Sequence, residues 1–255
     1  MKAVLLAGGL GTRMREETEF RPKPMVEVGG RPVLWHIMKV LGSQGITDFI
    51  ICTGYKSEMI KDYFLNYSSF NLDFTVGLGN SKDVVFHGQH QESNWNVTVA
   101  DTGPETNTGG RIKKIEKHLS GEPFLCTYGD GIANINLKQL LDTHQTRGKI
   151  ATITCVQPTS RFGVVDTDKE GLVKAFREKP QVQDWINIGY FMFENEIFNF
   201  LEEDSILEDE PLHELSRLGQ LGQYKHEGFW QPMDTYRESQ ILNQMWSAGA
   251  PWKMW

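Results

Sequence analysis

The sequence predicts an α/β fold in which a mostly parallel sheet is flanked by helices. Apolar runs of strand length alternate with segments of helix length up to residue 156. Because parallel strands need crossover connections, this alternation predicts a parallel sheet with right-handed crossovers. The 255 residues can bury one large core, and no Pro/Gly/Ser-rich linker interrupts them. We therefore expect a single domain over residues 1–255, with halves of about 1–135 and 136–255.

The first half opens with a short apolar strand at Ala3–Leu6, which ends in a glycine-rich turn. A helix over Val33–Gln44 and a strand over Asp48–Thr53 follow. A helical pattern then begins at Ser57, and another begins near Gly110.

The second half continues the alternation and then changes character. A strand over residues 123–132 precedes a helix over 136–148 and a strand over 150–156. From Arg161 on, shorter runs at 163–168 and 171–180 predict a small antiparallel hairpin. The segment 187–201 is then expected to pass from strand to helix, and a tail rich in tryptophan is expected to serve packing or subunit contact.

Composition excludes several classes of protein. A hydrophobic fraction of 39% and a charged fraction of 23% are typical of an ordered globular protein. A formal net charge of −7 argues against general binding to nucleic acid. No apolar run approaches the roughly 20 residues that span a bilayer, so we expect a cytoplasmic protein without membrane contact. Cys52, Cys126 and Cys155 lack the spacing of a metal or redox pair, which favours buried thiols.

Three glycines follow the first strand. Gly8, Gly9 and Gly11 leave the backbone bare, and a glycine-rich turn between strand and helix typically binds phosphate through its N–H groups. Neither familiar motif fits, because the third glycine of GxGxxG is replaced by Met14 and no GxxxxGK[ST] is present. Arg13 and Lys23 add two positive charges close to the turn, and both are expected to reach one phosphate chain.

The segments GGLGTRM and RPKPMVEVGGRPVLWH resemble the signature of the sugar-phosphate nucleotidyltransferases. The resemblance implies a Rossmann-like fold of the nucleotide-diphospho-sugar transferase type. It further implies that the glycine loop surrounds a triphosphate, that Arg13 contacts the outer phosphates, and that Lys23 lies beside the α-phosphate. The nucleotide-binding residues so implied are Leu6, Ala7, Gly8, Gly9, Leu10, Gly11, Thr12, Arg13, Lys23, Thr106, Gly109, Gly110, Arg111 and Gly129.

Four later segments, TYGDG, REKP, NIGYFMF and WQPMDT, resemble further signatures of this family in the same order. They imply that Mg²⁺ is held by Asp130 and Asp234, and that Asp130 is catalytic together with Arg13 and Lys23. The sugar-phosphate residues implied are Tyr128, Glu178, Lys179, Asn187 and Gly189. Structural roles also remain open: Asp130 suits a turn, Asp234 suits a helix N-cap, and REKP suits a solvated strand end.

One departure narrows the resemblance. Many members have a proline three residues after the loop arginine, whereas this chain has Glu16. With LWHIMK, TGGRIKK, GFWQPMDT and APWK, this resembles the members that use CTP and α-D-glucose 1-phosphate to make CDP-glucose and pyrophosphate. Those members are homo-oligomers that supply deoxysugar synthesis for cell-surface polysaccharides such as O-antigen. The same chemistry with UTP or dTTP, and a silent nucleotide-binding regulatory subunit, are the alternatives.

Other arrangements of reactive side chains point to no second chemistry. His87 and His90 form an HxxH pair with no third ligand at metal-binding spacing, which favours a solvated loop. His213 lacks the second histidine of a zinc protease motif. No GxSxG segment supports a serine nucleophile.

Overall fold

The computed structural model describes residues 1–79, 83–160 and 162–255, and for residues 15 and 16 it describes the backbone alone. The side chain of Glu16 and the whole of Arg161 thus lie outside the described part of the chain.

Within the described residues, seven strands form the central sheet in the order β14-β10-β13-β8-β1-β4-β7. Their bounds are Leu221–Lys225 (β14), Ala151–Val156 (β10), Ile186–Phe193 (β13), Phe124–Tyr128 (β8), Lys2–Ala7 (β1), Asp48–Thr53 (β4) and Asn96–Asp101 (β7). Neighbouring strands run parallel except at β13, which is antiparallel to both β10 and β8. The predicted mostly parallel sheet is confirmed.

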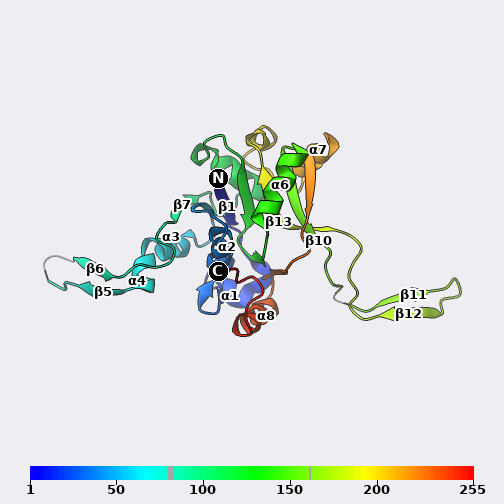
Figure 1. The fold of residues 1–255 in the computed structure, drawn as a ribbon, viewed down its shortest axis with the longest axis horizontal. Coiled ribbons are helices and arrows are strands. Elements are labelled where there is room, and N and C mark those ends of the chain that lie inside the picture. Colours follow the sequence, from blue (N-terminus) through cyan, green and yellow to red (C-terminus); the bar gives the residue numbers. More distant parts are fainter. Residues whose placement is uncertain (80–82, 161) are drawn as a thin grey trace.

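Helices cover both faces of this sheet (Figure 1). On one face lie α2 (Val33–Gly42), α6 (Leu137–Arg147) and α8 (Tyr236–Ser247); on the other lie α5 (Thr108–Lys114), the 3₁₀ helix η4 (Asn195–Phe200) and α7 (Glu210–Arg217). Ala3 and Leu5 of β1 pack toward the first face, while Val4 and Leu6 pack toward the second. A strand buried on both sides must be apolar throughout, which explains the continuous run at the N-terminus.

Shorter elements connect these layers. They are η1 (Thr12–Met14), α1 (Arg15–Thr18), η2 (Lys23–Met25), β2 (Glu27–Val28), β3 (Arg31–Pro32), α3 (Ser57–Leu65), α4 (Tyr67–Asn71), β5 (Asp73–Val76), β6 (Val84–His87), η3 (Glu116–His118), β9 (Gly131–Ala133), β11 (Val164–Thr167), β12 (Val173–Arg177) and β15 (Trp230–Pro232).

Three predicted elements differ from the structure. The helix from Ser57 ends at Leu65 and a second one starts at Tyr67, because the chain leaves helical geometry at Asn66. The strand predicted over 123–132 is divided into β8 and β9 by a turn at residues 129 and 130. The helix predicted after β13 is the 3₁₀ helix η4. The sequence predicts no helix or strand for the segments that form β2, β3, β5, β6, β7, β14, β15, α7 and α8.

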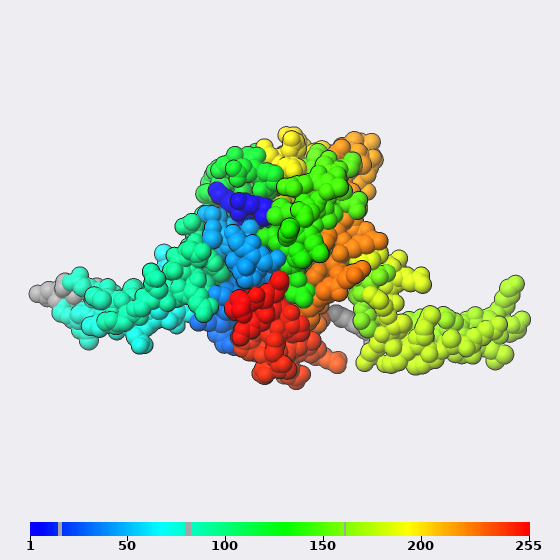
Figure 2. Space-filling model, viewed as in Figure 1, coloured from blue at the N-terminus to red at the C-terminus, as the bar shows by residue number. Residues whose placement is uncertain are grey.

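Two hairpins project from opposite ends of the molecule (Figures 1 and 2). One is β5–β6, and the other is β11–β12, which confirms the hairpin predicted over 163–180. Every residue of these four strands is exposed, including Val85 and Phe86 on the first hairpin and Val173 and Phe176 on the second. Both projecting hairpins therefore expose several apolar side chains to solvent.

The tryptophan-rich tail packs against α2 and belongs to the core. Trp252 is fully buried, its ring stacks on Phe229 at 5.4 Å, and its Nε1 donates to Nδ1 of His36 at 3.2 Å. The Nε2 of His36 lies 2.7 Å from the carbonyl oxygen of Val28. Burial lowers the pKa of His36 to about 4, so this histidine is neutral and donates to Val28. The tail therefore serves packing within the chain. It no longer supports the expectation of subunit contact.

No helix in the described ranges is long and apolar enough to cross a membrane.

Candidate active site

A cleft of about 770 Å³ opens where the carboxyl ends of β1 and β8 meet. Its walls include most of the residues predicted from the sequence motifs: Leu6, Ala7, Gly8, Gly9, Gly11, Thr12, Arg13, Lys23, Thr106, Arg111, Tyr128, Asp130, Asn187 and Asp234. In open α/β sheets this edge is the usual place for ligands. The remaining predicted residues, which do not line the cleft, are Leu10, Gly109, Gly110, Gly129, Glu178, Lys179 and Gly189.

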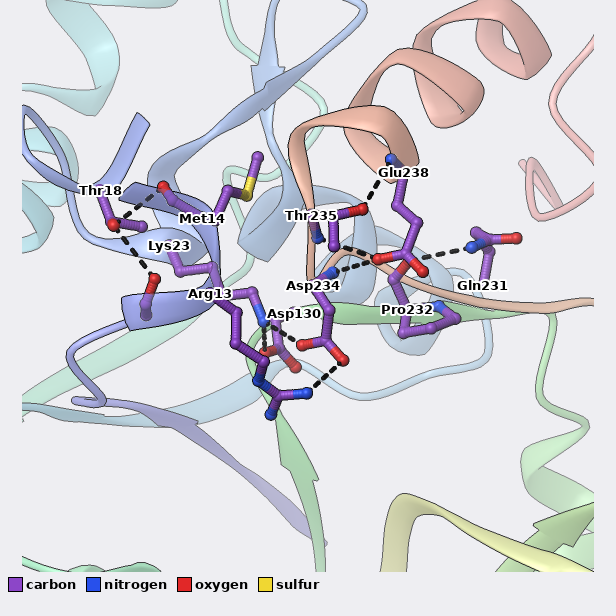
Figure 3. A network of polar contacts seen from close by, with 11 residues as sticks. Arg13, Met14, Thr18, Lys23, Asp130, Gln231, Pro232, Asp234, Thr235 and Glu238 are labelled. Carbon is purple, nitrogen blue, oxygen red and sulfur yellow. Dashed lines mark hydrogen bonds and ion pairs between the residues drawn. The ribbon is translucent and has the colours of Figure 1, made fainter. Parts of the chain in front are cut away.

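Four charged side chains form a chain of ion pairs at the centre of this cleft (Figure 3). The Nζ of Lys23 lies 2.6 Å from Oδ2 of Asp130 and 2.5 Å from Oδ1 of Asp234. The other oxygen of Asp234 is 2.9 Å from Nη1 of Arg13. Residues that are 107 and 211 positions from Lys23 are thus brought to one ammonium group.

The cluster is asymmetric in its exposure to solvent. The Lys23 side chain is only 9% exposed, whereas that of Arg13 is 75% exposed. Burial opposes the charge of Lys23, but the two aspartates outweigh it and raise the pKa of Lys23 above its ordinary value. Lys23 is accordingly a fixed cation, while Arg13 pairs with Asp234 at the solvent-exposed mouth of the cleft.

Backbone pairing brings Asp234 beside Asp130. β15 pairs with β9, and the N–H of Met233 donates to the carbonyl oxygen of Asp130 at 2.9 Å. The N-cap of α8 is Thr235, whose hydroxyl accepts from the N–H of Glu238, so Asp234 is not the capping residue. The Glu238 carboxylate in turn accepts from the N–H groups of Asp234 and Thr235 at 2.8 and 2.9 Å. A capping box therefore holds the backbone of Asp234 while its carboxylate faces Lys23.

The glycine loop is fixed from outside by side chains and backbone of other segments. The Gly8 carbonyl accepts from the N–H of Tyr55 at 3.1 Å and from Nη2 of Arg111 at 2.9 Å. A Cβ on Gly8 would lie 2.1 Å from Nη1 of Arg111. Gly11 adopts a φ of +62°, which favours glycine, and its carbonyl accepts from the Thr18 hydroxyl at 3.1 Å.

Arg111 is buried and holds the glycine loop through its hydrogen bonds; we call it the Arg111 clamp. Besides Gly8 its guanidinium donates to the carbonyl oxygens of Thr53 and Gly103, at 3.1 and 2.7 Å, and to the Thr102 hydroxyl at 2.6 Å. These bonds tie the glycine loop to the end of β4 and to the segment before α5. Arg111 thus lines the cleft, but its donors are used within the protein, and a role in holding the nucleotide stays a prediction.

Several predicted glycines are explained by packing. Cβ atoms on Gly109 and Gly110 would lie 2.8 and 2.1 Å from backbone oxygens of Ser205 and Glu203. A Cβ on Gly189, whose φ is +79°, would lie 2.0 Å from the ring of Tyr128. These glycines admit other parts of the chain, and their predicted contacts with nucleotide and sugar stay predictions.

Glu178 and Lys179 lie just beyond β12, and both side chains are 61% exposed. Neither belongs to the cleft wall. Their contact with a sugar phosphate stays a prediction.

The histidines of the HxxH pair lie in different settings. His90 is half-buried, with Nδ1 3.8 Å from Oε2 of Glu92, so the predicted solvated position is wrong for it. His87 lies on β6 rather than in the expected loop, is exposed, and hydrogen-bonds through Nε2 to the Thr75 hydroxyl at 2.9 Å. His213 is exposed on α7. In the part of the chain that the structure describes, no three His, Cys, Asp or Glu residues are grouped to hold a metal ion.

Comparison with known proteins identifies the family. The nucleotidyl transferase family model matches residues 2–231. The chain belongs to the nucleotidyl transferase family. This nucleotidyl transferase is 46% identical, over the full length of both chains, to glucose-1-phosphate cytidylyltransferases of Salmonella typhimurium and Salmonella typhi. Its fold is similar to that of HddC from Yersinia pseudotuberculosis, with a TM-score of 0.70, 22% identity, and coverage of 96% of this chain and 99% of that one.

The two aspartates of this nucleotidyl transferase suit a magnesium ion. Mg²⁺ is commonly held by one or two carboxylates together with substrate phosphates, and a dedicated protein cage is not needed. The carboxylates of Asp130 and Asp234 already share one cation, the ammonium of Lys23. The pair therefore accommodates positive charge, and its hard oxygen donors match the metal.

One charged residue of this cleft belongs to none of the sequence motifs. Glu208 lines the wall and contacts both Tyr128 and Thr108. It lies in the acidic segment EEDSILEDEP, where no motif or spacing separates it from its exposed neighbours.

Proposed function

We propose that this nucleotidyl transferase transfers the cytidylyl group of CTP to α-D-glucose 1-phosphate, giving CDP-glucose and pyrophosphate. The identity of 46% to glucose-1-phosphate cytidylyltransferase, across the full length of both chains, carries the choice of substrates. The cleft supports the reaction class, because two cations and two carboxylates converge beside a glycine loop. We assign the nucleotide to the half of about 1–135 and the sugar phosphate to the rest.

The reaction is a direct in-line displacement. A phosphate oxygen of glucose 1-phosphate attacks the α-phosphorus of CTP, the bond from that phosphorus to the β-phosphate oxygen breaks, and pyrophosphate leaves with the electron pair. Both substrates are polyanions, so positioning and positive charge supply most of the catalysis. No side chain needs to act as a nucleophile.

Arg13 and Lys23 have different parts in this scheme. Arg13, which is exposed at the mouth of the cleft, binds the outer phosphates that leave as pyrophosphate, together with the N–H groups of the glycine loop. Lys23 is held rigidly and stabilises the charge that develops at the α-phosphate. Asp130 and Asp234 would hold Mg²⁺, which when bound supplies further positive charge to the phosphate oxygens.

Pyrophosphate release measured with glucose 1-phosphate and Mg²⁺, in parallel with CTP, UTP, dTTP, ATP and GTP, tests this function. We expect release with CTP and at least tenfold less with the other four nucleotides. Strong release with UTP or dTTP would keep the class of reaction and overturn the choice of base. Binding of CTP without turnover would support the regulatory alternative.

We also propose that the protein is a homo-oligomer. The support is the exposed apolar surface of the two projecting hairpins, one of which carries Glu178 and Lys179 at its base. Light scattering after size-exclusion chromatography should give a multiple of 29.1 kDa. Replacing Val173 and Phe176 with serine should reduce the mass, and a monomeric wild type would refute the proposal.

A further inference from the structure

Glu208 reaches the cleft from a segment that carries none of the sequence motifs. The segment connects η4 to α7, and Glu208 is half-buried within it. The Tyr128 hydroxyl donates to Oε1 of Glu208, and the Thr108 hydroxyl donates to Oε2 at 2.7 Å. One carboxylate thus joins the end of β8 to the start of α5.

The backbone around Glu208 is fixed by several hydrogen bonds to the start of α5. The N–H of Gly110 donates to the carbonyl of Ser205 at 3.0 Å, and the Asn107 side chain donates to the carbonyl of Asp204 at 3.0 Å. The N–H of Leu207 donates to the Thr108 hydroxyl at 2.9 Å. Gly109 and Gly110 allow the segment before Glu208 to pack closely against α5. These contacts fix the position of Glu208.

The carboxylate of Glu208 restricts which ligand groups can bind beside it in the cleft. An ionised carboxylate only accepts hydrogen bonds, and it repels the phosphates that the cleft is built to bind. The Tyr128 hydroxyl directs its proton to Glu208, so its oxygen faces the cleft as an acceptor. The wall formed by Glu208 and Tyr128 therefore offers acceptors, which suit the hydroxyl groups of a sugar.

The order of strands indicates which substrate lies against this wall. Tyr128 ends β8, and Asn187 is on β13, the neighbour of β8 on the side away from β1 and β4. The glycine loop and the Arg111 clamp lie on the β1–β4 side. Glu208 therefore lies between the start of α5, which it contacts through Thr108, and the end of β8, which it contacts through Tyr128. Tyr128 is the member of this wall that faces the β13 side of the cleft, where Asn187 also lines it.

We propose that Glu208 is a specificity-determining residue for the sugar 1-phosphate, accepting a hydrogen bond from a ring hydroxyl while orienting the Tyr128 hydroxyl. This inference rests on the proposed function, because it takes glucose 1-phosphate as the acceptor substrate. It adds a residue outside the motifs to the sugar side of the cleft.

The test compares wild type with Glu208→Gln, which keeps the shape but removes the charge and one acceptor. We expect KM for glucose 1-phosphate to rise by about 10- to 100-fold, the range for a hydrogen bond to a charged group, with KM for CTP changed by less than about threefold. Glu203→Gln is the matched control, since Glu203 is exposed in the same segment, and it should behave like wild type.

Deoxy analogues separate sugar recognition from a general effect on folding. Among 2-, 3-, 4- and 6-deoxyglucose 1-phosphate, one should be a poorer wild-type substrate than glucose 1-phosphate by about 10-fold or more. Glu208→Gln should lose most of that discrimination, because the amide loses the charge and replaces one acceptor oxygen with a donor. Tyr128→Phe, which keeps the carboxylate, should retain part of it.

Two outcomes would overturn the inference. One is an equal rise in KM for both substrates, and the other is unchanged discrimination among the deoxy analogues in Glu208→Gln. Calorimetric binding of CTP and glucose 1-phosphate to both proteins gives the same comparison without turnover. A wild type that binds both substrates but releases no pyrophosphate would overturn the proposed function alone.

Discussion

Replacing Lys23 with alanine is expected to lower kcat by about 10²- to 10³-fold, the usual cost of removing one fixed group that stabilises transition-state charge. Lys23 is buried, is held by Asp130 and Asp234 at 2.6 and 2.5 Å, and has a raised pKa, so it presents a permanent positive charge. KM for CTP should change far less, because Arg13 and the glycine loop remain. Steady-state pyrophosphate release gives both constants.

Arg21→Ala is the control for this experiment. Arg21 precedes Lys23 by two residues but pairs with Glu17 and Glu27 outside the cleft. Its loss should leave kcat within about twofold of wild type, since exposed ion pairs contribute little. Full turnover by a folded Lys23→Ala protein would refute the role assigned to Lys23, and thermal unfolding shows whether the variant is folded.

Replacing Trp252 with alanine is expected to lower the free energy of unfolding by about 3–5 kcal/mol, the cost of emptying a large aromatic site in a core. Trp252 is fully buried, stacks on Phe229, and donates to His36. Trp255→Ala, which removes a half-buried ring at the end of the chain, should cost less than half as much. Denaturant unfolding monitored by circular dichroism measures both.

The pH dependence of the free energy of unfolding tests whether Trp252 stabilises the protein by burying His36. The pKa of His36 is about 4 in the folded protein and near 6.5 when unfolded, so the unfolded state binds the extra proton between these values. Stability from this group is therefore complete at neutral pH and falls by about 2 kcal/mol from pH 7.5 to pH 5. Trp252→Ala opens the site to water and should show a smaller fall. An unchanged pH dependence, or a cost below about 1 kcal/mol, would contradict the packing role.

How far the candidate site could be predicted differs from residue to residue. Arg13 and Lys23 stand out because positive charge follows a glycine turn and a short apolar strand, a local pattern with few other uses. Gly110 and Gly189 stand out equally, yet the structure uses them to admit Glu203 and the ring of Tyr128. A glycine indicates that another group approaches the backbone closely at that position. The neighbouring sequence does not distinguish a ligand from another segment of the chain.

Local order in the sequence was enough to predict the alternating α/β fold, which is confirmed, and a glycine loop with two nearby cations, which line one cleft. The reason is that strand burial on both faces and bare backbone leave their mark on consecutive residues. The convergence of Lys23, Asp130 and Asp234, the burial of the tail around His36, and the arrival of Glu208 in the cleft came from the folded chain. Each of these depends on contacts between residues about 80 or more positions apart, which sheet order and loop packing create and local spacing does not record.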